Sequence, residues 1–299
     1  MNHTKGKMRR RTALIALAFL LPFLILYTIF TIWPVIQGFY VSLHKWGLMG
    51  KQDFLGFANY AKLLTDNNFW GALRNTLVFT VITTPLLVVT ALVLALFANR
   101  PNRIKRGLRI LYYLPSVLSV SVASFIAKFV FSPYTGLLNG ILHAIGVLPA
   151  GQEIQWLNDP VLAMITVSVM TVWWTVGFSM LLYLSGLQDI SPDLYEAAAI
   201  DGASKRQQLF SITLPLLKPT TWLVILLQMI ACIKVYGQIS LITGGGPASS
   251  TRPLVQYVYE TAFKRSDMGY AAAISYVLFA ILLVLSLVQQ ALQRRGNQQ

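Results

Sequence analysis

The sequence predicts an all-α, polytopic membrane protein with six transmembrane helices and both termini in the cytoplasm. Of its 299 residues, 56% are hydrophobic and 11% are charged, whereas a soluble domain carries roughly 25% charged residues. A chain this apolar cannot cover a water-facing surface. Apolar runs long enough to cross a bilayer as helices, which takes about 20 residues each, recur along the chain. Residues 1–299 are therefore predicted to form a single transmembrane domain.

Six apolar stretches reach the required length. Their approximate ranges are 13–42, 72–98, 109–131, 161–186, 219–242 and 270–292. The first stretch follows the basic sequence KGKMRRR, which resembles the basic region of a signal peptide. The apolar stretch lacks a convincing small-residue cleavage site, so we expect it to be retained as a helix. Pro22 and Pro34 are expected to kink that helix or to end it early.

The distribution of Lys and Arg predicts the orientation, because cytoplasmic loops carry the excess of these residues. With the N-terminus in the cytoplasm, 15 of the 24 basic residues fall inside and 7 outside, while Lys128 and Lys234 fall within spans. The segment 187–218 is then cytoplasmic. The outer loops cover about 43–71, 132–160 and 243–269.

The cytoplasmic segment 187–218 is unusually polar, since four of the ten acidic residues of the chain lie between positions 189 and 201. Ser191-Pro192-Asp193 is typical of a helix start, because serine can cap and proline suits the first helical position. Gly202 then predicts the helix end.

A second helix is expected to follow at once. Ser204 and Gln207 have the spacing of a capping box, and Pro215 and Pro219 should interrupt the helix that they begin. The segment is thus predicted to be two short helices at an angle, joined at residues 201–203.

A helix of about ten residues is marginal alone in water, so the first helix must pack on the rest of the chain, on lipid headgroups or on another protein. Residues 189–201 carry four acids and no base. The inner leaflet of the membrane is negative, which disfavours lipid as the partner. Docking to a protein and packing within this chain remain the two alternatives.

The same segment resembles the signature of ABC importer permeases, which is EAA, three residues, Gly, nine residues and I-x-L-P. Here it reads Glu196-Ala197-Ala198, Gly202 and Ile212-Thr213-Leu214-Pro215, with the intervals kept. Further stretches are similar to carbohydrate-uptake permeases of the maltose and glycerol-phosphate type. They are residues 54–80, 132–142 (SPYTGLLNGIL), 241–263 (beginning LITGGGP) and 268–275 (MGYAAAIS).

This resemblance identifies the chain as a six-span first permease of a multiple-sugar system. It departs from the larger permease of the maltose system, which has two more spans and a sizeable periplasmic insertion. The resemblance implies a bacterial or archaeal cytoplasmic (inner) membrane location. It also implies a second permease, two ATPase subunits, and an extracellular or periplasmic solute-binding protein as partners.

In such an importer the partner ATPase subunits bind ATP and Mg²⁺, so the resemblance implies no cofactor and no catalytic residue in this chain. Its short cytoplasmic helix would press into a cleft on one ATPase subunit. The residues implied in this coupling are Glu196, Ala197, Ala198, Asp201, Gly202, Ile212, Leu214 and Pro215.

Polar residues in the fifth apolar stretch are candidates for the substrate pathway. Gln228, Cys232, Tyr236 and Ser240 recur every four residues as one stripe. Lys234 and Gln238 form another stripe on a different face. Such stripes line a pathway or bind neighbouring helices; the pathway candidates are Gln228, Lys234, Tyr236 and Gln238. Lys234 either faces the pathway or pairs with a second permease; the alternative is that it snorkels or hydrogen-bonds to the backbone in a helix break.

Other features exclude several classes of function. No P-loop sequence occurs, the three histidines lack metal-ligand spacing, and the basic residues do not form the single face expected of a nucleic-acid-binding protein. An ion-coupled secondary transporter is the alternative function. Proton coupling usually needs a carboxylate within the membrane, and all ten acidic residues fall outside the predicted spans.

Overall fold

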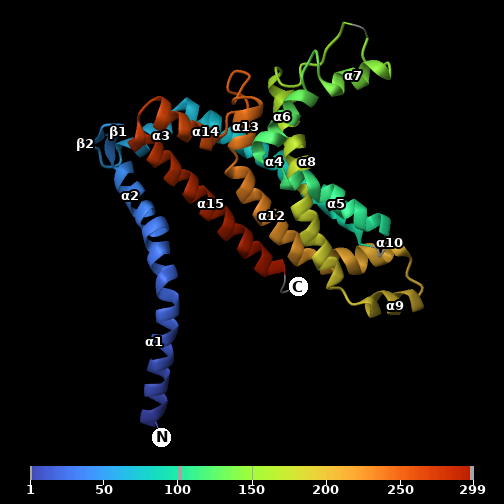
Figure 1. Cartoon of the computed structure of the whole chain (residues 1–299), viewed down its shortest axis with the longest axis horizontal. Coiled ribbons are helices and arrows are strands. Elements are labelled where there is room, and N and C mark those ends of the chain that lie inside the picture. Colours follow the sequence, from blue (N-terminus) through green and yellow to red (C-terminus); the bar gives the residue numbers. More distant parts are fainter. Residues whose placement is uncertain (1, 100–102, 150, 297–299) are drawn as a thin grey trace. The chain divides into compact units, whose positions relative to one another are not determined.

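The computed structural model describes residues 2–99, 103–149 and 151–296. These residues form helices and loops, with one antiparallel hairpin of β1 (His44–Gly47) and β2 (Gly50–Phe54). Figure 1 follows the elements along the chain. The chain divides into two compact units, residues 1–65 with 258–277 (unit 1) and 66–257 with 278–299 (unit 2). Arg100, part of the basic loop predicted for the cytoplasmic side, lies outside the described residues.

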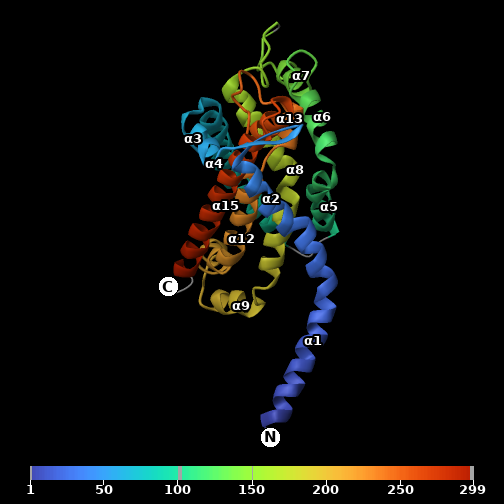
Figure 2. The same ribbon diagram turned by 90° about the vertical axis from the view of Figure 1, so that its left-hand side faces the viewer.

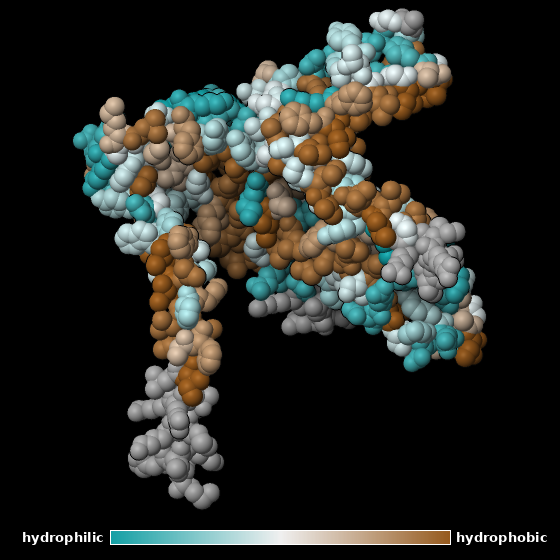
Figure 3. Space-filling view, in the orientation of Figure 1, coloured by the Kyte–Doolittle hydropathy of each residue, from teal (hydrophilic) through white to brown (hydrophobic). Residues whose placement is uncertain are grey.

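Unit 1 begins with an uninterrupted helical segment. It consists of α1 (Asn2–Tyr27), the π-helical turn η1 (Thr28–Ile32) and α2 (Trp33–Ser42). The expected early end of the helix does not occur. Pro22 lies inside α1, and the helix continues past Pro34. Proline lacks an N–H and its ring conflicts with the carbonyl four residues earlier; the wider turn η1, just before Pro34, accommodates that conflict. Hydrophobic residues cover the coloured part of this segment in Figure 3.

The rest of unit 1 comes from two separate stretches of the chain, one after α2 and one around the start of the last long helix. The hairpin β1–β2 is followed by α3 (Ala58–Thr65), and the π-helical turn η3 (Glu260–Lys264) precedes α15 (Met268–Gly296). The hairpin falls in a region that the sequence predicted only as an outer loop.

Unit 2 is built on the packing of α4 (Asn67–Ala98) against α8 (Pro160–Gln188). Ala91 and Ala95 of α4 are fully buried in a cluster with Met180 and Tyr183 of α8. Small residues let the two backbones approach closely, which is how helices associate where lipid removes the hydrophobic driving force.

The predicted span 109–131 is bent. It consists of α5 (Arg103–Val117) and α6 (Val120–Val130), which meet at 100°. Pro115 lies in the last turns of α5, and the Ser119 hydroxyl accepts a hydrogen bond from the Val122 amide at 3.3 Å, which caps a new helix. The chain then continues through α7 (Leu137–Ala144) to α8.

The predicted span 219–242 is also interrupted. It consists of α12 (Lys218–Ile233) and α13 (Gly237–Ile242), separated by residues 234–236. The assumed polar stripe with a four-residue period is therefore wrong, because Tyr236 and Ser240 lie beyond the break and lose the helical phase of Gln228 and Cys232. After α13 the chain passes through α14 (Leu254–Tyr259).

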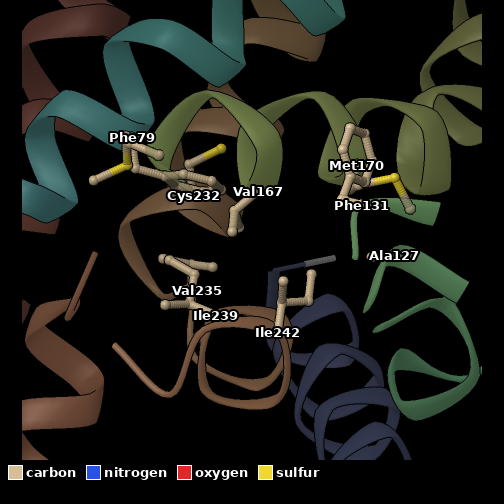
Figure 4. Packing of buried hydrophobic residues seen from close by; sticks show 10 residues of the cluster. Phe79, Ala127, Phe131, Val167, Met170, Cys232, Val235, Ile239 and Ile242 are labelled. Carbon is tan, nitrogen blue, oxygen red and sulfur yellow. The ribbon is translucent and has the colours of Figure 1, made fainter. Parts of the chain in front are cut away.

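A hydrophobic cluster in unit 2 joins α4, α6 and α8 to the region of the helix break (Figure 4). Phe79, Ala127 and Val167 come from the three helices, and Val235 and Ile239 come from the break and α13. The break is thus packed in the core of unit 2.

Among the residues that the structure describes, four helices are long and apolar enough to cross a membrane. They are Ile15–Ser42, Asn67–Ala98, Pro160–Gln188 and Met268–Gln293. Two bent pairs, Gly107–Val117 with Val120–Val130 and Lys205–Leu216 with Lys218–Ile233, raise the number to six if each pair is one span. The predicted class, an all-α membrane protein, is confirmed.

Asp159 is expected to stabilise the start of α8. One of its carboxylate oxygens accepts hydrogen bonds from the amides of Val161 at 2.9 Å and Leu162 at 2.8 Å. Replacing Asp159 by alanine should cost about 1 kcal/mol, whereas asparagine should retain most of the stability because it also caps. Thermal unfolding of the purified protein in detergent measures both, and equal midpoints for the two variants would contradict this role.

Candidate functional site

The segment after α8 contains α9 (Pro192–Ile200), which has the predicted helix start. The Ser191 hydroxyl accepts a hydrogen bond from the Asp193 amide at 3.3 Å, and Pro192 occupies the first helical position. None of the residues of α9 is buried. In both ribbon views α9 lies at the opposite end of unit 2 from α7 (Figures 1 and 2).

Gly202 ends α9 as predicted. Its φ of +79° is in the left-handed region that favours glycine. The Gly202 amide donates to the carbonyl of Ala199 at 3.1 Å, and the Ala203 amide donates to that of Ala198 at 2.8 Å. This pair of bonds is a Schellman motif, which satisfies the last carbonyls of the helix.

The predicted second helix begins at the capping box of Ser204 and Gln207, which is confirmed. It comprises α10 (Lys205–Gln208), the π-helical turn η2 (Leu209–Thr213) and α11 (Leu214–Leu216). The helix bends by 59° into α12. Of the predicted coupling residues, Ile212 lies in η2, and Leu214 and Pro215 form the turn before this bend.

Two hydrogen bonds tie α9 to the second helix. The hydroxyls of Tyr195 and Thr213 lie 2.9 Å apart, and the Gln208 side-chain amide donates to the Tyr195 carbonyl at 3.3 Å. Both Gln208 and Thr213 are buried. The inner side of α9 is therefore anchored to a segment that leads directly into α12.

The other side of α9 is exposed. Glu196, Ala197, Asp201 and Gly202 are exposed, Ala198 is half-buried, and the side chain of Ile200 is 87% exposed. Within the described part of the chain, neither Glu196 nor Asp201 forms an ion pair. The structure thus places the predicted residues of this helix, together with the exposed Ile200, on one mixed apolar and acidic surface formed by residues 196–202.

The predicted pathway residues divide into two groups. Gln228 is buried and donates a hydrogen bond to the Ser179 hydroxyl of α8 at 2.9 Å. This contact joins two helices, so Gln228 has the environment of a packing residue and not of a pathway residue. Lys234 is exposed at the break between α12 and α13, and Tyr236 and Gln238 beside it are half-buried.

Gln238 lines a small cavity in unit 2 with Ser124, Thr171 and Trp174. The Trp174 indole donates to the Leu118 carbonyl at 3.0 Å, a contact between α8 and the α5–α6 bend. The loop at Gly244–Pro247 is a turn held by neighbouring side chains: the Thr251 hydroxyl donates to the Gly246 carbonyl at 2.7 Å, and the Gln256 side-chain amide of α14 donates to the Gly244 carbonyl at 2.8 Å. Among the described residues no cluster of three metal-ligating side chains occurs.

Comparisons with known proteins agree with this architecture. Residues 60–297 match the family model described as binding-protein-dependent transport system inner membrane component. A probable ABC transporter permease of Bacillus subtilis, YurN, is 33% identical over 98% of this chain and 100% of its own length. The lactose transport system permease LacF of Rhizobium radiobacter is 35% identical over 91% of both chains.

A solved structure shares the fold. A chain of a bacterial ABC transporter involved in the import of the acidic polysaccharide alginate superposes with a TM-score of 0.84 at 24% identity. The match covers 98% of this chain and 99% of that chain.

The fold and the exposed segment are those of a polytopic α-helical transport subunit. The chain belongs to the family of binding-protein-dependent transport system inner membrane components, the permease subunits of ABC importers. The predicted resemblance to carbohydrate-type importer permeases is confirmed, and so are the inner-membrane location and the role as a transport subunit.

Proposed function

We propose that this chain is one of two permease subunits of an importer for a sugar or related solute, and that α9 couples it to a cytoplasmic ATPase. The observation that carries the coupling role is the exposure of residues 196–202, because a helix of about ten residues is marginal without a partner. The sugar assignment rests on the lactose system of a relative.

In this proposal α9 transmits the motion of the ATPase to the membrane helices. The Tyr195–Thr213 contact and the Gln208 bond hold α9 against the second helix, which continues through a 59° bend into α12. A rigid-body displacement of α9 would therefore pull on α12. ATP and Mg²⁺ would bind to two partner ATPase subunits, and a solute-binding protein would deliver the solute.

We further propose that six spans cross the membrane with both termini in the cytoplasm. The separation of α7 and α9 at opposite ends of unit 2 supports this topology. Lys234, Tyr236 and Gln238 would line the pathway, because interrupted helices place free backbone groups and polar side chains at the membrane interior. Gln228, which packs against Ser179, is left out of the pathway.

The energy source distinguishes this function from an ion-coupled transporter. Uptake into proteoliposomes that contain the whole importer should stop when the partner ATPase is made hydrolysis-dead. It should continue when an uncoupler removes the proton gradient. Uptake that collapses with the uncoupler and persists with the inactive ATPase would favour the secondary transporter instead.

A further inference from the structure

A cationic cavity lies within unit 1, and none of its lining residues belongs to α9 or to the predicted pathway residues. It has a volume of about 420 Å³ and lies between the hairpin, α3 and the turn before α15. The residues that matter for its chemistry are Lys45, Trp46, Asn59, Lys62, Arg265 and Asp267. We call it the hairpin pocket.

The walls of the hairpin pocket are held by close backbone contacts. The buried Asn59 side-chain amide donates to the carbonyls of Ser42 at 2.8 Å and His44 at 3.2 Å, which fixes α3 against the end of α2 and the start of β1. A Cβ atom at Gly269 would lie 2.1 Å from the His44 carbonyl oxygen, so only glycine lets α15 approach β1 this closely. The pocket is therefore formed before any ligand binds.

The charge of the hairpin pocket favours an anion. Lys45, Lys62 and Arg265 line it, and Asp267 is its one acidic lining residue. The Asp267 carboxylate already accepts from the Lys62 ammonium at 3.0 Å and from the Tyr270 amide at 3.2 Å. Lys45 has no ion pair with any residue that the structure describes. An anionic ligand would supply the missing negative charge.

The position of the hairpin pocket matches the headgroup layer of a membrane. The candidate span Ile15–Ser42 ends two residues before β1, and the candidate span Met268–Gln293 begins directly after Asp267. Groups just beyond the ends of two spans lie at the level of the lipid headgroups. Trp46 beside the pocket is an aromatic residue of the type enriched at that level. Hydrophilic residues gather over the hairpin at the upper left of Figure 3.

The tip of the hairpin exposes apolar side chains beside this polar surface. Leu48 is 62% exposed and Met49 is fully exposed, and Phe54 and Phe57 are also exposed. Apolar side chains flanked by lysines are the composition of segments that insert into the boundary between headgroups and acyl chains. Exposed apolar side chains mark protein or membrane contacts, and the position of this tip just beyond the ends of two candidate spans favours the membrane.

We propose that the hairpin pocket binds the phosphate of an anionic phospholipid, with Lys45 and Arg265 as its main contacts. The headgroup enters the pocket, and its acyl chains run beside the hairpin tip and the apolar helices α2 and α15. Phosphatidylglycerol fits this site better than phosphatidylcholine, because the choline ammonium would add positive charge to a site that already has an excess.

Lipid retention by the purified, assembled importer tests the proposal. Dioleoylphosphatidylglycerol and dioleoylphosphatidylcholine are titrated in detergent, and bound lipid is counted by native mass spectrometry. Each basic contact near a membrane surface is worth about 1 kcal/mol. The double variant Lys45→Gln/Arg265→Gln should therefore bind phosphatidylglycerol roughly tenfold or more weakly. Binding of phosphatidylcholine should not change.

Lys51→Gln is the matched control. Its ammonium lies over the Tyr40 ring, 4.9 Å from the ring centroid, and is not among the pocket residues. This variant should bind phosphatidylglycerol as the unchanged protein does. Equal thermal unfolding midpoints of the three proteins will show that both variants are folded.

Three results would overturn the proposal. The first is unchanged phosphatidylglycerol binding by the double variant. The second is displacement of the lipid by millimolar inorganic phosphate, which would indicate a site for a free anion. The third is a loss of affinity for the purified solute-binding protein with lipid binding unaltered, which would make the pocket part of a protein interface.

Discussion

Replacing Glu196 by lysine should abolish solute uptake while the permease remains in the membrane. Glu196 is exposed on a helix none of whose residues is buried, so the change removes no internal contact that would destabilise the fold. Reversing a charge at the centre of a protein interface costs about 2 kcal/mol or more, which corresponds to at least thirtyfold weaker binding of the ATPase. Co-purification of the ATPase and transport into proteoliposomes measure the two effects.

Asp189→Lys is the control for this variant. It makes the same change of charge in the same segment, but Asp189 lies at the end of α8 and outside α9. We expect it to retain most of the uptake. If Glu196→Lys shows normal uptake together with normal ATPase association, α9 is not the coupling element.

Replacing Gly177 by leucine should destabilise unit 2 severely. A Cβ atom at this position would lie 2.7 Å from both the Tyr112 carbonyl oxygen and the Tyr113 Cα atom. These are backbone atoms of α5, so α8 and α5 would have to separate. Overpacking of this kind costs about 3 kcal/mol, and a midpoint lower by roughly 10 °C would follow for a domain of this size.

Gly71→Ala provides the comparison in α4. No heavy atom lies within 4 Å of a Cβ atom at Gly71, and alanine favours the helix over glycine by up to about 1 kcal/mol. This variant should unfold at the same or a slightly higher temperature. Detergent-solubilised protein followed by fluorescence-detected size exclusion during heating compares the variants. Similar midpoints for Gly177→Leu and the unchanged protein would mean that α5 and α8 are not tightly packed.

Local signals predicted α9 and the short helix that follows it in detail. The capping serines at 191 and 204 and the glycine at 202 act through hydrogen bonds and dihedral angles within a few residues, so the sequence shows them directly. The apolar ranges likewise correspond to helices, because the length of an apolar run is a property of consecutive residues.

The same reasoning failed where a helix is interrupted. A four-residue polar period predicted one stripe through Gln228 and Tyr236, but the break at residues 234–236 separates them. The 100° bend between α5 and α6 was also not predicted, although Pro115 and Ser119 are its local signals. Apolar composition indicates that a segment can enter a membrane, and it does not indicate that the segment is straight.

The membrane class, the apolar ranges, the caps of α9 and the importer signature follow from the sequence alone, because each of these depends on neighbouring residues or on composition. Three relations are visible only in the folded chain: Gln228 contacts Ser179, residues 196–202 share an exposed surface, and Lys45 and Arg265 line one cavity. These relations join residues that are 6 to 220 positions apart. The contacts between distant residues depend on how closely helices and backbone segments approach one another, at positions such as Gly177 and Gly269. A pattern of neighbouring residues does not predict such an approach.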